Sequence, residues 1–333
     1  MNKERKVPAG AFTVAPGIWG MKDKIVNFYM IEDQQSGGWV LIDAGLKWSY
    51  GKIKSMATKL FGKESKPTCI VLTHGHFDHV GSVARLAEEW EVPVFAHYME
   101  IPYLTGKSSY PPPDPSVGGG MMSAMAFMYP KTPINIWQHV RVLPNDETIP
   151  GLNGWKYIHT PGHAPGHISL FREDDKILIA GDAFVTTKQE SAISSMTNRR
   201  ELSGPPKYFT TDWDAAEASV RKLAYLHPNV AATGHGAPME GAELKESLEH
   251  LVKNFREIAL PAQGRYLHQP AVADVNGVVY VPEKQNAASN GMVWKAFSVS
   301  AAIALGFVIS NISTKRRRLR YYKQDMLNFE YNY

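Results

Sequence analysis

Three histidines and one aspartate lie within six residues of this sequence, at His74, His76, Asp78 and His79. Imidazole nitrogens and carboxylate oxygens together suit zinc or a similar divalent ion. Because alternate residues of so short a turn point to different sides, one ion cannot readily take all four groups. The spacing therefore predicts that His74 and His76 bind one ion, and that Asp78 and His79 bind its neighbour.

The residues on either side of this cluster indicate how the fold positions it. An apolar run at 69–72 is typical of a buried strand. After the cluster, apolar residues recur at the spacing of a helix that packs one face on a core: Val80, Val83, Leu86, Ala87 and Trp90. The cluster is thus expected on the turn after a strand, where a rigid scaffold presents a loop for chemistry.

Further candidate ligands follow three other runs that are typical of strands. These ligands are His163, Asp182 and His235, and the runs before them are 155–158, 176–180 and 230–233. A single histidine in such a place is more often structural than a ligand. Because all of them accompany the first cluster, at strand ends, the sequence favours one shared metal site.

Together these positions resemble the motif set of the metallo-β-lactamase-fold hydrolase superfamily, over about residues 7–260. The matching positions, in order, are Asp43, His74-x-His76-x-Asp78-His79, His163, Asp182 and His235. The resemblance implies an α/β fold, a four-layered αβ/βα sandwich with the metals at one edge. It also implies two zinc ions, and other divalent ions such as Mn²⁺ or Fe²⁺ would suit the same ligands.

The resemblance also implies a role for each residue. It assigns one ion to His74, His76 and His163, and the other to Asp78, His79 and His235, with Asp182 as the bridge. Between the two Pro-Gly-His histidines it favours His163 as the ligand and leaves His167 a supporting role. Asp43, in an Asp-x-Gly turn, is expected to orient a ligand histidine without binding the metal itself.

The implied function is hydrolysis by two metal ions. Ions about 3.5–4 Å apart share a hydroxide that attacks an ester, thioester or lactone carbonyl, and Asp78 would pass a proton to the leaving group. The site resembles that of the glyoxalase II and lactonase-like branch. Many lactonases of the family have a tyrosine three residues after the bridging aspartate, where this chain has Val185. The commonest β-lactamases have a cysteine in the place of Asp182, so antibiotic hydrolysis is not expected.

Two alternatives are a phosphodiesterase or nuclease of the same fold, and a metal-binding module without enzyme activity. The charge argues against the first. The net charge is +4, and residues 315–333 alone contribute six basic and two acidic residues, so residues 1–314 sum to zero. A nuclease needs a basic surface for phosphates, so no nucleic-acid partner is expected. The complete ligand set argues against the second alternative.

Residues 1–262 are expected to form the hydrolase domain, because one α/β domain can hold this length. Within it, residues 105–133 contain clusters of proline and glycine, which predict a lid-like insertion. Pliable apolar side chains of this lid would contact a partly apolar small-molecule substrate: Met121, Met122, Met125, Phe127, Met128 and Tyr129.

The C-terminal part differs in composition. Residues 263–290 resemble a linker, and residues 291–333 are expected to form a hydrophobic helix with a basic tail. Its uncharged part, 296–314, matches a bilayer span in length, and the basic residues after it would hold 291–320 at a membrane surface. The alternative is a soluble helix that packs on a partner or on the lid. With no signal-peptide pattern at the N-terminus, a cytoplasmic protein is expected, with or without this membrane contact.

Overall fold

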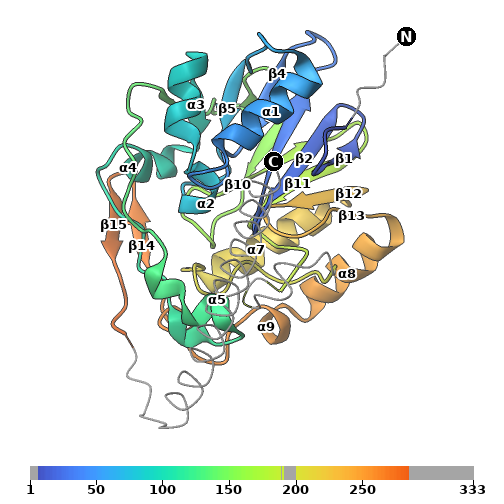
Figure 1. The fold of residues 1–333 in the computed structure, drawn as a ribbon. Coiled ribbons are helices and arrows are strands. Elements are labelled where there is room, and N and C mark those ends of the chain that lie inside the picture. The colour runs from blue at the N-terminus through green and yellow to red at the C-terminus, as the bar shows by residue number, and fades with distance from the viewer. Residues whose placement is uncertain (1–6, 189, 191–199, 285–333) are drawn as a thin grey trace, which may run out of the picture. The chain divides into compact units, whose positions relative to one another are not determined.

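A computed structural model describes residues 7–188, 190 and 200–284 of the chain. Two large sheets run through this part (Figure 1). The first has the strand order β1-β2-β3-β4-β5-β6-β7 and the second β13-β12-β11-β10-β9-β8. In the first sheet, β1 to β4 pair antiparallel and β4 to β7 pair parallel.

The strands are short, and most are buried. Those of the first sheet are β1 (Ala11–Ala15), β2 (Ile18–Asp23), β3 (Val26–Glu32), β4 (Trp39–Ile42), β5 (Cys69–Val71), β6 (Val94–Ala96) and β7 (Val140–Val142). Those of the second are β8 (Thr148–Ile149), β9 (Leu152–His159), β10 (Ile168–Arg172), β11 (Ile177–Gly181), β12 (Val230–Thr233) and β13 (Met239–Glu240).

Alternate residues of a central strand face two different cores. In β4, Trp39 and Leu41 pack with the helices outside the first sheet, whereas Val40 and Ile42 pack in the core shared with the second sheet. Side chains of a strand alternate between the two faces of its sheet. A strand that is apolar on both faces therefore belongs in the middle of a layered structure.

Helices cover the outer faces of both sheets. Four of the five apolar residues predicted after the first cluster form the buried face of α3 (Val83–Trp90), beside α1 (Tyr50–Phe61), and the fifth, Val80, ends the short helix α2 (Phe77–Val80). The second sheet is covered by α7 (Trp213–Tyr225) and α8 (Gly241–Lys253). Figure 1 shows these two helix pairs on opposite sides of the sheets. The predicted four-layered αβ/βα sandwich is confirmed.

One pair of strands was not expected from the sequence. The range 263–290, for which a linker was predicted, contains a hairpin of β14 (Val272–Asp274) and β15 (Gly277–Tyr280). It belongs to the compact unit Met1–Lys284, beyond the expected domain boundary at 262. The Asn276–Gly277 dipeptide between two valine-containing runs is a hairpin signal that could have revealed it.

The predicted C-terminal helix cannot be compared with the structure. Residues 285–333, which include the expected hydrophobic helix and basic tail at 291–333 and the expected membrane contact at 291–320, lie outside the described residues. In the part of the chain that the structure describes, no helix is both long enough and apolar enough to cross a membrane.

Candidate metal centre

The predicted ligands lie on loops that leave the carboxyl ends of strands. His74 and His76 follow β5, and α2 (Phe77–Val80) carries Asp78 and His79. His163, Asp182 and His235 follow β9, β11 and β12. Parallel pairing of β4 with β5 and of β11 with β12 brings the ends of each pair to one edge of its sheet. Within each sheet, the topology thus explains why the loops that carry the ligands lie at one edge.

The structure brings all seven predicted ligands together, and all seven side chains are buried. Their ligand atoms form three groups, and within each group these atoms lie within 4.8 Å of one another. The groups are His74, His76 and His163; Asp78, His79 and His235; and His74, His79 and Asp182. The first two are the ligand sets that the resemblance implies, and the third connects them.

Asp182 occupies the position between the two sets. Its Oδ2 atom lies 3.4 Å from His163 Nε2, which belongs to the three-histidine group. The same oxygen lies 3.6 Å from His79 Nε2 and 3.0 Å from His235 Nε2, which belong to the other group. A single carboxylate oxygen therefore contacts both sets, as a bridging ligand would.

The outer ring nitrogens of the histidines are held by the surrounding protein. Asp43 Oδ2 lies 2.8 Å from His79 Nδ1, and the Ile25 carbonyl oxygen lies 2.6 Å from His235 Nδ1. Such contacts fix the tautomer of a ligand histidine, so that its other nitrogen faces the metal with a lone pair. Asp43 also accepts hydrogen bonds from the backbone N–H and hydroxyl of Thr73, both at 2.8 Å.

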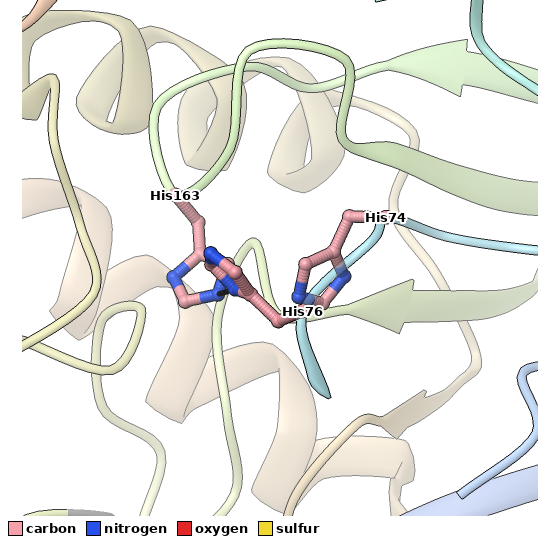
Figure 2. A group of neighbouring side chains, drawn as sticks. All are labelled: His74, His76 and His163. Carbon is pink, nitrogen blue, oxygen red and sulfur yellow. Dashed lines mark hydrogen bonds between the residues drawn. The ribbon is translucent and has the colours of Figure 1, made fainter. Parts of the chain in front are cut away.

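Several polar atoms that face the centre have no partner. Among the described residues, His74 Nε2, His79 Nε2 and Asp182 Oδ1 are buried without a hydrogen bond. Figure 2 shows the rings of His74, His76 and His163 turned toward one another. Buried polar atoms without partners cost free energy, and a divalent cation would satisfy all of them. The donor set therefore fits a metal, and it contains the nitrogen and oxygen ligands that zinc prefers.

The three-histidine group is neutral. Burial lowers the pKa of His74 and His163 well below the usual value, and it lowers that of His76 to about 3. Neighbouring histidines contribute in the same direction, because a second positive charge nearby is unfavourable. These rings therefore keep unprotonated nitrogens at neutral pH.

The other group carries charge. Burial alone would lower the pKa of His79 and His235, but the carboxylates, Asp182 above all, raise both. Burial alone would raise the pKa of Asp182, yet His235 and His79 hold it well below its usual range. Burial raises the pKa of Asp78, whose Oδ2 lies 3.7 Å from His235 Nε2.

The structure separates the roles of the two Pro-Gly-His histidines. His167 accepts a hydrogen bond from the backbone N–H of Asp182 at 2.8 Å, and its Nδ1 lies 2.9 Å from Thr160 Oγ1. Both of its ring nitrogens are thus occupied by protein atoms. His163 instead places Nε2 3.0 Å from His76 Nδ1 inside the cluster, which agrees with its expected role.

Comparison with known proteins agrees with this geometry. The family model described as the metallo-beta-lactamase superfamily matches residues 21–235. Over 254 residues the chain is 43% identical to the probable metallo-hydrolase YflN of Bacillus subtilis, covering 76% of this chain and 96% of that protein. The chain belongs to the metallo-beta-lactamase superfamily.

Two further similarities are more distant. Over 156 residues, 47% of the chain and 65% of the relative, it is 30% identical to the hydroxyacylglutathione hydrolase GloC of Haemophilus influenzae. A solved Cronobacter sakazakii metallo-beta-lactamase, a mutant of a HARLDQ-motif protein, matches with a TM-score of 0.53 at 19% identity, covering 75% of this chain and 94% of that chain. At that identity the likeness shows the superfamily fold alone.

Sequence reasoning missed Phe77 and Phe209, which form an aromatic wall with Tyr129 beside the ligands. The ring of Phe209 stacks on that of His76, with centroids 4.6 Å apart and an interplanar angle of 27°. Phe77 stacks on Tyr129 at 5.5 Å. Phe77, directly after His76, was the one member that the motif itself could have indicated. Phe209 lies in no motif, so only the fold places it there.

The predicted lid reaches this wall with only two of its six residues. Met122 and Tyr129 pack with the cluster of Val117, Ala126, Tyr208 and Phe209. In contrast, the structure leaves four side chains with large exposed surfaces, at Met121, Met125, Phe127 and Met128. Burial raises the pKa of Tyr129 to about 12, and the charge of Asp78 acts in the same direction. Tyr129 therefore lies close enough to the centre for the charge of Asp78 to act on it.

Proposed function

We propose that this chain is a dinuclear-metal hydrolase that acts on an ester, thioester or lactone carbonyl. The observation that carries the proposal is the contact of one Asp182 oxygen with both ligand sets, at 3.4 Å to His163 and 3.0 Å to His235. Two zinc ions suit the donors best, and Mn²⁺ or Fe²⁺ would also bind them. Two metal ions held by these residues would lower the pKa of a bound water to about 7 and would polarise the oxygen of the substrate carbonyl.

The chain's own residues supply positioning and proton transfer. Asp182 holds the two ligand sets at a fixed separation. Asp43 orients His79 through the contact of 2.8 Å with Nδ1. Asp78 would pass a proton to the leaving group.

Charge and similarity favour a carbonyl substrate over a phosphodiester. Residues 1–314 have no net charge, and so they offer no general attraction to a polyanion. The relative GloC is named for the hydrolysis of an acylated glutathione, which is a carbonyl compound. The aromatic wall of Phe77, Tyr129 and Phe209 beside the ligands supports a substrate with an apolar acyl or aryl part.

Matched substrates test this proposal. The zinc-loaded enzyme would be assayed with p-nitrophenyl esters of increasing acyl length, the corresponding thioesters, lactones, and bis-p-nitrophenyl phosphate. We expect kcat/KM to be higher for the carbonyl substrates and to rise with acyl length, because about 0.8 kcal/mol is gained for each buried CH₂. Faster turnover of the phosphodiester would contradict the reaction class, and a flat acyl series would contradict the apolar contact.

A further inference from the structure

A buried carboxylate outside the ligand set joins two ligand loops. Glu100, in the short 3-10 helix Tyr98–Glu100, is fully buried. Its Oε2 accepts a hydrogen bond from the backbone N–H of Gly75 at 2.9 Å, and its Oε1 accepts one from Gly166 at 2.7 Å. Gly75 lies between His74 and His76, and Gly166 lies three residues after His163. One side chain therefore spans both loops of the three-histidine group.

Both donors are glycines, and the space around them explains why. A Cβ atom at Gly75 would lie 2.7 Å from the Tyr110 hydroxyl oxygen, and one at Gly166 would lie 2.8 Å from Glu100 Cγ. Such contacts are too short for real side chains, so any larger residue would push the backbone away from the carboxylate. The two glycines permit the close approach that the hydrogen bonds need.

Tyr110 supports the same carboxylate and touches the ligand loop as well. Its hydroxyl accepts a hydrogen bond from the Gly75 N–H at 2.9 Å, and its ring centroid lies 4.5 Å from that of His76. Its hydroxyl donates to Glu100 Oε2, and its ring stacks on Tyr103 with centroids 3.9 Å apart. The unexpected hairpin contributes here, because Val278 packs against this aromatic pair and its N–H donates to Ser108 Oγ at 3.1 Å. Tyr110 therefore holds Glu100 in place while it also contacts the loop of His74 and His76.

We propose that Glu100 is a positioning residue, which holds the loop of His74 and His76 at a fixed position relative to the loop of His163. In this way it sets the metal affinity of these three histidines. It acts through the backbone of the two glycines. This inference depends on the metal centre of the proposed function. Residues that orient metal ligands typically change affinity by about 10- to 100-fold when they are replaced.

Glu100→Gln is the informative variant, because it keeps the size of the side chain. Its amide nitrogen cannot accept a hydrogen bond, so one of the two glycine N–H groups loses its acceptor. We expect the affinity for at least one of the two zinc ions, measured by competition with a chromophoric chelator, to fall by about 10- to 100-fold. Tyr110→Phe removes the hydroxyl that Gly75 N–H also meets, but it retains both carboxylate-to-backbone bonds and the ring beside His76, so we expect a smaller loss.

Asp33→Asn is the matched control. Asp33 is also a buried carboxylate, and it accepts hydrogen bonds from Ser36 N at 3.0 Å and Asn153 Nδ2 at 2.9 Å, in neither ligand loop. We expect it to lower thermal stability and leave zinc affinity unchanged. If the wild type binds zinc, an unchanged zinc affinity in Glu100→Gln would overturn the inference. An equal loss of zinc affinity in Asp33→Asn would also overturn it. A wild type without zinc affinity would overturn the metal centre itself.

Discussion

Asp182→Ala is expected to lose one of two bound zinc ions and more than about 100-fold in kcat/KM. The reason is that one oxygen of this carboxylate contacts His163, His79 and His235. Without it, the two ions would share no bridging carboxylate among the seven ligands, and the second ion would have only Asp78, His79 and His235. Loss of a direct ligand should exceed the about 10- to 100-fold effect that is typical of residues behind the ligands. Metal analysis and ester kinetics on the same preparation would measure both effects.

Two further variants separate this effect from damage to the fold. Asp182→Asn keeps the shape of the side chain and removes its charge, so we expect the same direction of change with less loss of stability. Asp174→Ala removes an exposed carboxylate from the turn between β10 and β11, and it should behave as the wild type. Full metal content and activity in Asp182→Ala would show that Asp182 is not a bridge.

Asp43→Ala should have the second-largest effect, and it should reduce both stability and metal binding. The substitution leaves three buried groups without their acceptor: the N–H and hydroxyl of Thr73 and Nδ1 of His79. Breaking a buried charge pair costs about 3–5 kcal/mol. Alanine is also strained at this position, because the backbone φ is 59°. We expect a clearly lower midpoint in denaturant-induced unfolding, together with weaker zinc binding.

Asp43→Asn distinguishes the two consequences. Asparagine tolerates a left-handed backbone and keeps one acceptor oxygen, so most of the stability should remain. With that oxygen bonded to the Thr73 N–H, the amide nitrogen takes the place of Oδ2 beside His79 Nδ1 and cannot accept its proton. The preferred tautomer of His79 then changes, and zinc affinity should still fall by about 10- to 100-fold. Wild-type zinc affinity in Asp43→Asn would contradict the orienting role.

The metal ligands were predictable because their residue types and their strands carry strong local signals. The apolar run before His74 predicts a strand, and the spacing after His79 predicts a helix, so together they locate the loop that holds the first cluster. The later ligands each follow an apolar run as well. The sheet topology then places the ends of these strands close together in space. The structure brings together every ligand that was predicted this way, and it places Asp43 against His79.

Residues that act through the backbone were not predictable. Glu100 contacts the N–H groups of two glycines, and the presence of a glycine does not indicate which distant carboxylate its N–H meets. The lid was predicted from composition alone, which indicates pliable apolar residues but not their orientation. Composition therefore could not separate Met122 and Tyr129, which pack at the aromatic wall, from the exposed Phe127.

The central claim is that the chain holds two metal ions at one site. The most direct test is the zinc content of the full-length protein after saturation with zinc and removal of the unbound metal, determined by mass spectrometry against an amino-acid-based protein concentration. We expect two zinc ions per chain in the wild type and one in His235→Ala, which loses a ligand of only one set. One ion or none in the saturated wild type would contradict the account.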